Sequence, residues 1–238
     1  MFGGTGLALA VMALEQLSGR PALWASAQFL APVPAGSVLL LEGQIVSAGH
    51  VIAHGELRGS VGGEAALTAL GSFGDRADSN ARQWSAAPIA PPPRDCAEVN
   101  AHRDADLDIH STLEVRVARG RFGIFSREPT APGGVVEVWM RHRHRPNDRI
   151  ALAFMADFVP SVVGNALDMR AGGNSLDNNI RYCGNAETGW VMGRFAIDAV
   201  VGGIGHGRVE LFAEDGTLLA LASQSFKLRA MPRTGEAV

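Results

Sequence analysis

Two stretches of the chain carry their large apolar residues at helical spacing. Residues 7–14 read LALAVMAL and residues 150–157 read IALAFMAD, with five of eight positions identical at an offset of 143. The larger apolar side chains recur on one face, which predicts two Ala-rich helices. Thr5 is the predicted cap of the first helix, and Asn147 or Asp148 that of the second.

Each helix is followed by segments in which apolar and polar residues alternate, as is typical of antiparallel strands. A Gly-Gly pair at 62–63 leads into residues 65–73, and an Asp-Gly pair at 215–216 leads into residues 218–226. Both pairs predict a β-hairpin. The offset beyond these turns is 153, so the second helix-to-strand connection is ten residues longer than the first.

The repeat predicts two similar domains, at 1–74 and 109–230, each with one helix and an antiparallel sheet. A Pro-rich stretch at 75–108 is predicted to be a linker, and residues 231–238 a tail. The helix of each domain is expected to be buried on all sides, because the sheet curls around it. This is the hotdog arrangement, so the predicted fold class is α+β, a double hotdog made of two tandem repeats.

The two halves differ before their helices. The second half has two strand candidates there, at 113–117 and 135–142, whereas the first half starts almost on its helix. A sheet without that strand would leave backbone groups unpaired. We therefore expect either a natural product that is roughly 15–25 residues longer at its start, or a sheet that tolerates the missing strand.

Composition excludes several classes of protein. Lys and Arg (21) nearly balance Asp and Glu (24), so nucleic-acid binding is not expected. The basic run at 141–145 is interpreted as a solvated loop, with contact to the phosphates of an anionic ligand as the alternative. Cys96 and Cys183 are too few for a disulfide framework or a zinc site, which favours reduced thiols in a cytoplasmic protein. The apolar run at 7–14 is too short to cross a bilayer, and no metal or cofactor is predicted.

The repeat also serves as an internal control, because most paired positions keep their apolar character. Three pairs do not, and in each the second half carries a hydrogen-bonding side chain where the first is apolar or bare. The pairs are Leu14 and Asp157, Ala22 and Ser175, and Gly71 and Gln224.

Periodicity places two of these polar residues on buried faces. Asp157 continues the helical face of Ile150 and Phe154, and Gln224 shares strand parity with Phe226. A buried polar group without a partner costs roughly 1–3 kcal/mol. Taken singly, the Asp is more often a cap or surface residue, the Ser without function, and the Gln a satisfied core amide. Their coincidence at asymmetric positions predicts that Asp157, Ser175 and Gln224 meet one another and a water molecule.

At this point the sequence resembles the acyl-CoA thioesterase II family of double-hotdog enzymes, over nearly the whole chain. The resemblance depends on the order and spacing of several short motifs. They are Phe2-Gly3-Gly4 (FGG in the family), Phe29-Leu30-Ala31-Pro32 (FLRP), Leu113-Glu114-Val115-Arg116 (LEVR), Val138-Trp139-Met140-Arg141 (VWIR), Ala156-Asp157 (ASD), Ser175-Leu176-Asp177 (TID) and Ala222-Ser223-Gln224.

The resemblance implies hydrolysis of acyl-CoA to a free acid and CoA. In that family an Asp, a Thr or Ser, and a Gln hold the hydrolytic water, and by position these are Asp157, Ser175 and Gln224. Asp157 is then the expected general base. Gly3 and Gly4 are candidate substrate contacts, since backbone N–H groups at a helix start stabilise an oxyanion.

Two other functions are compatible with such a fold. A hotdog enoyl-CoA hydratase would need Asn and His where this chain has Val159 and Val162. A double hotdog that only binds acyl-CoA or a partner protein would not need the polar trio. We also expect the two halves to pair in one continuous sheet, and the chain to form a homodimer or homotetramer, because free sheet edges need a partner.

Overall fold

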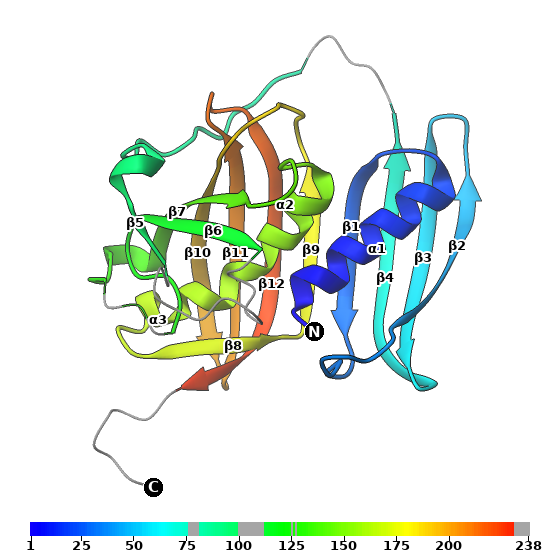
Figure 1. Cartoon of the computed structure of the whole chain (residues 1–238), viewed down its shortest axis with the longest axis horizontal. Coiled ribbons are helices and arrows are strands. Elements are labelled where there is room, and N and C mark those ends of the chain that lie inside the picture. The colour runs from blue at the N-terminus through cyan, green and yellow to red at the C-terminus, as the bar shows by residue number, and fades with distance from the viewer. Residues whose placement is uncertain (76–80, 100–111, 125, 127, 231–238) are drawn as a thin grey trace, which may run out of the picture.

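The computed structural model describes residues 1–75, 81–99, 112–124, 126 and 128–230. The chain begins with one long helix and four strands (Figure 1). They are α1 (Gly3–Ser18), β1 (Ala22–Phe29), β2 (Leu40–Ala48), β3 (Ile52–Val61) and β4 (Glu64–Gly74).

Beyond residue 90 the chain forms shorter helices and eight further strands in the described residues. The helical elements are η1 (Pro93–Asp95), η3 (Pro132–Gly134), α2 (Arg149–Met155), η4 (Ala156–Val162) and α3 (Val163–Ala166). The strands are β5 (Ala97–Glu98), β6 (Leu113–Arg119), β7 (Val135–His142), β8 (Ala171–Ser175), β9 (Asp177–Tyr182), β10 (Val191–Val201), β11 (Ile204–Ala213) and β12 (Leu218–Ala230).

All twelve of these strands belong to one sheet. Its order is β2-β3-β4-β1-β9-β12-β11-β10-β7-β6-β5, with β8 paired to β12 off this path. The order β2-β3-β4-β1 is mirrored by β10-β11-β12-β9, as a repeat requires. The two parts join where β1 pairs antiparallel with β9, from Trp24 opposite Arg181 to Gln28 opposite Asp177. The expectation of one continuous sheet is therefore confirmed.

The ends of the two long helical segments have different local causes. Asp148 caps α2, since its Oδ1 accepts a hydrogen bond from Ala151 N at 2.9 Å. The prediction of Thr5 as a cap is wrong: α1 already begins at Gly3, and its N-cap residue Phe2 has no capping side chain. At the other end, Gly19 adopts φ 64°, and its N–H donates to Glu15 O.

The helix after Asp148 tightens where the sequence predicted a regular α-helix. Residues up to Met155 are α-helical, and Ala156–Val162 form a 3₁₀-helix. Pro160 explains the change, because it has no N–H for the carbonyl of Ala156 and its ring crowds that carbonyl. Asp157 thus lies in the first turn of η4.

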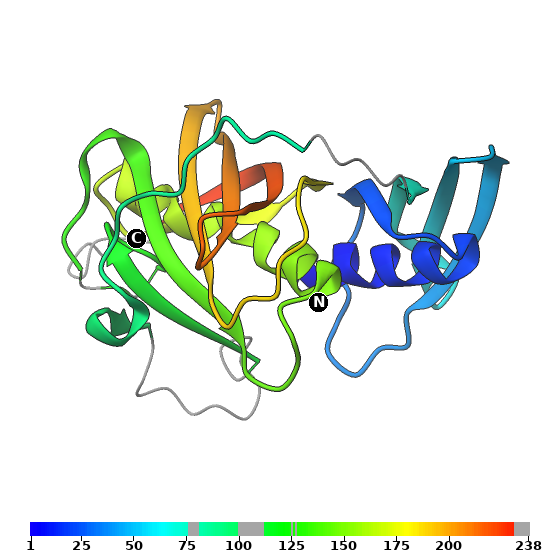
Figure 2. The same ribbon diagram turned by 90° about the horizontal axis from the view of Figure 1, so that it is seen from above.

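The predicted linker is not uniformly without structure. Its residues Ala97 and Glu98 form β5, which pairs with Val117 and Arg116 of β6. Earlier in the same stretch, the Gln83 Oε1 atom accepts a hydrogen bond from Leu218 N at 2.6 Å. Residues 81–95 of this segment run across the second part of the sheet (Figure 2). The predicted tail, 231–238, lies outside the described residues.

One apolar core runs through both parts of the molecule. Its buried residues include Leu7 and Phe73 from the first part and Phe195 and Phe226 from the second. Full burial of the helix is confirmed for most of η4 but wrong for α1, where Met12 and Leu17 are exposed. Among the described residues, the sheet ends at β2 on this side and does not continue around α1.

Candidate active site

Asp157 lies at the junction of the two parts of the molecule. The N-terminal part of α1 packs against the α2–η4 segment, and the Gly4 position lies against Phe154 and Asp157. The Asp157 side chain is buried, as its helical periodicity predicted. The first helix and the second thus meet at a carboxylate.

Ser175 and Gln224 reach the same place from the sheet. Strand β12 pairs with β9 as far as Ser223 and with β8 from Phe226 onward. Gln224 therefore lies where β12 changes partner, and Ser175 is the last residue of β8 before that change. Gln224 is buried, as its strand parity predicted.

The structure brings the three sequence-predicted residues into direct contact. Ser175 Oγ donates to Asp157 Oδ1 at 3.1 Å, and Gln224 Nε2 donates to the same carboxylate oxygen. Gln224 Nε2 also lies 2.8 Å from Ser175 Oγ. The side chains form one closed hydrogen-bonded cluster around a buried carboxylate.

Asn178 is a fourth member of the cluster, which the sequence analysis missed. Its Nδ2 donates to Asp157 Oδ1 at 3.3 Å, and its side chain is fully buried on β9. The repeat contained a signal for it: the offset of 153 that aligns Ser175 with Ala22 also aligns Asn178 with Ala25. A polar residue again stands where the first half is apolar.

The glycines at the start of α1 have different environments. Gly4 N–H donates to Asp157 Oδ2 at 2.7 Å, so it holds the carboxylate and not a substrate oxygen. A Cβ on Gly4 would lie 2.5 Å from Phe154 O, and a Cβ on Gly3 would lie 2.8 Å from Asp157 Oδ2. Both positions are too crowded for a side chain, which explains the two glycines.

Burial dominates the ionisation of Asp157. It raises the pKa of the carboxyl from 3.8 to about 7, although Gly4, Ser175, Gln224 and Asn178 all donate hydrogen bonds that lower it. The positive end of the α1 dipole favours the anion as well. The result is a carboxyl group that changes its charge near neutral pH, as a general base requires.

Two oxygen atoms of the cluster have no hydrogen-bond partner within the described residues. They are Asn178 Oδ1 and Gln224 Oε1, both buried. A buried acceptor without a donor is costly, so each is a place where a further hydrogen-bonding group would be stabilised.

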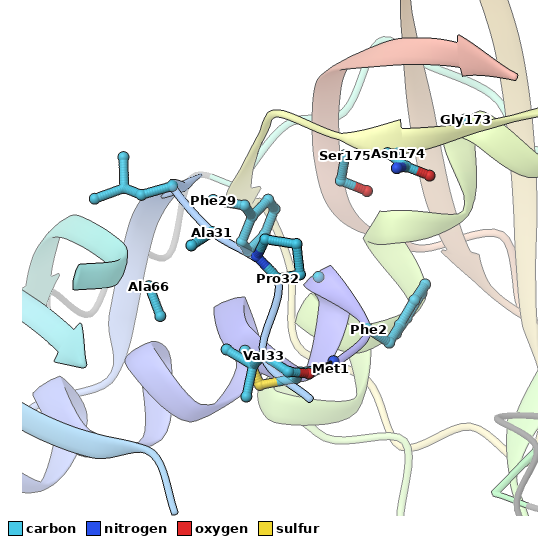
Figure 3. A pocket seen from close by; sticks show the side chains of 12 residues that line it. Met1, Phe2, Phe29, Ala31, Pro32, Val33, Ala66, Gly173, Asn174 and Ser175 are labelled. Atoms are coloured by element: carbon cyan, nitrogen blue, oxygen red, sulfur yellow. Dashed lines mark hydrogen bonds between the residues drawn. The ribbon is translucent and has the colours of Figure 1, made fainter. Parts of the chain in front are cut away.

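A cleft of about 370 Å³ opens beside the cluster. Ser175 lies on its wall, together with Phe2 and Gly3 from the start of α1 and Phe29 from the end of β1 (Figure 3). Asn178 and Gln224 are not part of its lining. A ligand in this cleft would contact Ser175, which is hydrogen-bonded to Asp157, although the Asp157 side chain is not itself part of the lining.

The basic run lies away from this cluster, on β7 and the turn that follows. Arg141 and Arg143 both form ion pairs with the buried Glu114, and Arg143 also pairs with Glu98. Arg145 pairs with Asp148, the N-cap residue of α2. Residues 143–145 form an exposed loop after the end of β7, as the first interpretation of this run expected, and the three arginines form ion pairs within the protein.

Val159 and Val162, where a hydratase would need Asn and His, are buried apolar residues of η4. Cys96 and Cys183 are free thiols. In the part of the chain that the structure covers, no group of three or more His, Cys, Asp or Glu could hold a metal ion. Over the same residues, no helix has the length and apolarity needed to cross a membrane.

Solved structures with the same fold identify its class. A protein from Alicyclobacillus acidocaldarius, described as having the hot dog fold, matches with a TM-score of 0.84 and 23% identity over 97% of this chain and 88% of that one. The acyl-CoA thioesterase II TesB2 of Mycobacterium marinum matches with a TM-score of 0.74 and 23% identity, over 97% and 90% of the two chains. The fold is therefore of the hotdog type, α+β.

The family follows from two closer matches. Residues 93–226 match the model of the acyl-CoA thioesterase C-terminal domain. A Novosphingobium aromaticivorans protein, provisionally named a thioesterase, is 34% identical over 97% of this chain and 88% of its own, with a TM-score of 0.86. The chain belongs to the acyl-CoA thioesterase II family and is a thioester hydrolase. No curated protein matches the sequence significantly.

Proposed function

We propose that the enzyme hydrolyses acyl-CoA to a free acid and CoA, with a water molecule activated by Asp157 and oriented by Ser175 and Gln224. The observation that supports this most is that Ser175 and Gln224 both bond to the buried Asp157 carboxylate, whose pKa is about 7. The other half of the chain is apolar or bare at all three aligned positions. Membership of the family makes acyl-CoA the expected substrate.

The hydrogen bonds favour Oδ2 as the basic atom of Asp157. Oδ1 accepts from Ser175, Gln224 and Asn178, whereas the one protein donor to Oδ2 among the described residues is Gly4 N–H. Gly3 lines the cleft, and a Cβ on it would lie 2.8 Å from Oδ2, so the missing side chain keeps this approach to Oδ2 open. A water in the cleft beside Gly3 would donate to Oδ2, and the unpartnered Gln224 Oε1 would accept its other hydrogen.

In this mechanism Asp157 takes a proton from the water as its oxygen attacks the thioester carbonyl carbon. The tetrahedral intermediate then collapses, the carbon–sulfur bond breaks, and the proton on Asp157 passes to the departing CoA thiolate. Backbone N–H groups near Gly3 are the proposed donors to the oxyanion, since Gly4 N–H is engaged with the carboxylate. Positioning dominates, because the thioester is itself reactive.

The test is an Asp157→Asn variant, assayed by the release of free thiol from acyl-CoA of graded chain length. Loss of the general base should lower kcat by about 10²-fold or more. Asp198→Asn, at an exposed ion pair with Arg208, is the matched control and should keep its activity. An Asp157→Asn enzyme with wild-type turnover would contradict the assignment.

We also propose that the fold is a double hotdog, with domains at 1–74 and 109–230 joined by 75–108. The mirrored strand order on either side of the β1–β9 pairing supports two repeats. The domain that carries Asp157, Ser175 and Gln224 would be the catalytic one, and the first would contribute the start of α1. The free cysteines fit a reducing compartment such as the cytoplasm.

Association into a homodimer or homotetramer is a further part of this proposal. Strand β2 ends the sheet within the described chain, and Leu40 and Val46 on it are exposed. An edge strand with exposed apolar side chains is stabilised by a partner. Light scattering should show a species of at least twice the 25.0 kDa chain mass, and a purely monomeric protein at working concentration would be evidence against association.

A further inference from the structure

We propose that Asn178 is a positioning residue for the general base: its buried amide holds the Asp157 carboxylate in place and favours its ionised form, without touching the reacting atoms. This inference rests on the proposed role of Asp157.

Asn178 lies at the seam of the sheet, where β1 pairs with β9. It lies on β9, opposite Ala27 of β1, and its side chain is not exposed at all. It shares strand parity with Ile180, which is equally buried in the core. The Asn178 amide donates to Asp157 Oδ1, the carboxylate oxygen away from the proposed basic atom Oδ2, so it acts on the chemistry through Asp157.

The hydrogen bonding of the Asn178 amide is one-sided. Nδ2 donates to Asp157 Oδ1, while Oδ1 of the same amide has no partner within the described residues. A buried amide with an orphan acceptor is less stable than an apolar side chain of the same shape. The aligned position in the first half is Ala25, so the fold itself does not need an amide there.

The groups that donate hydrogen bonds to the Asp157 carboxylate carry no charge. They are Gly4 N–H from α1, Ser175 from β8, Asn178 from β9 and Gln224 from β12, and all of them are neutral donors. No Lys, Arg or His is among the causes that shift its pKa. Each neutral donor therefore has a measurable share in holding the pKa down against burial.

The test uses Asn178→Leu, which keeps the shape but removes both polar atoms. The acid limb of the kcat profile, where kcat falls as Asp157 becomes protonated, should move to higher pH by about 0.5–1. At pH 7, kcat should fall about 2- to 5-fold, with KM little changed. Thermal stability should stay equal or rise, since the orphan acceptor is gone. Asn179→Ala, on the same strand with its amide bonded to Ser223, is the control and should leave the acid limb in place.

The outcomes separate this role from a structural one and from failure of the proposed function. Asn178→Ala removes the same donor and should shift the acid limb in the same direction, even if Asn178→Leu folds poorly. If Asp157→Asn is inactive but the folded Asn178 variants keep the acid limb of the wild type, whatever their stability, the role of Asn178 is overturned and that of Asp157 is not. A fully active Asp157→Asn enzyme overturns both the general base and its positioning residue.

Discussion

At the scale of single residues, Asp157 is subject to two opposing effects. Burial favours the neutral acid, whereas four hydrogen-bond donors favour the carboxylate. Burial is the larger effect, and the pKa rises to about 7. A carboxylate on the surface would have a pKa near 3.8 and would be a weaker base. A buried carboxyl group without hydrogen-bond donors would stay protonated at neutral pH. The cluster therefore adjusts the basicity of Asp157 to neutral conditions at a cost in stability.

That cost predicts a pH dependence of folding. The folded-state pKa of Asp157 lies above its ordinary value of 3.8, so its contribution to stability is present at about pH 4 and is lost as the pH rises through about 7. A pKa difference of about three corresponds to roughly 4 kcal/mol. From pH 4 to pH 8, the wild type should lose on the order of 2–4 kcal/mol relative to Asp157→Asn. Urea denaturation of both proteins at each pH measures this, and parallel stability curves would refute it.

The residues of the cluster were accessible to sequence reasoning to different degrees. Asp157 and Gln224 stood out because they break the repeat on apolar faces, and Asn178 carried the same signal opposite Ala25. The hydrogen bond from Gly4 N–H to Asp157 carried no such signal. To predict it one must know that the start of α1 packs against the α2–η4 segment, which only the three-dimensional packing determines.

At the scale of elements, the start of α1 is fitted to the α2–η4 segment. Phe2 packs against Phe154 and Phe158, with ring centroids 5.1 Å apart in both pairs. This packing fixes the first turn of α1 so that Gly4 N–H points at Asp157 Oδ2. An N-terminal helix dipole and a directed N–H then act on the same carboxylate.

This fit predicts a large effect of one methyl group at Gly4. In Gly4→Ala the new Cβ would meet Phe154 O at 2.5 Å, so α1 must move away and its hydrogen bond to Asp157 weakens. We expect kcat to fall about 10- to 100-fold and the acid limb to move to higher pH. Gly172→Ala is the control, because its Cβ would meet only Ile124 Cδ1 at an ordinary 3.6 Å. Equal activity of the two variants would exclude this role of α1.

The elements themselves were predicted where local chemistry determines them. The two hairpins and the strand at 135–142 follow from turn residues and alternation, and Asp148 is an ordinary cap. Three features differ: α1 starts before Thr5, β5 lies inside the predicted linker, and η4 is 3₁₀. A two-residue strand has no periodicity of its own, so its pairing with β6 could not be read from the sequence.

At the scale of the whole molecule, the β1–β9 seam and the shared core make one folding unit of two repeats. The seam pairs five residues of each strand, and the buried core passes through it without interruption. The repeat could be recognised from the sequence, but the strand that each half offers to the other could not, because β1 and β9 alternate like any other strands. The cluster contains residues from both sides of this seam, since Gly4 of the first half and Ser175 and Gln224 of the second all bond to Asp157.

A single folding unit should unfold in one cooperative transition, and the repeat supplies a matched pair of probes. Leu57 on β3 and its counterpart Leu211 on β11 are both buried in the common core. Replacing either by Ala should cost about 2–5 kcal/mol. Each substitution should then lower the same single melting transition by several degrees, and thioesterase activity should disappear at the temperature of that transition in both variants. If the halves were independent, calorimetry would show two transitions. Leu57→Ala would then shift only the unfolding of the first half, and the second half, with Ser175 and Gln224, would stay folded through that transition. Because Gly4 holds Asp157 across the seam, loss of the first half alone should already abolish catalysis, so activity would then disappear before the second transition begins.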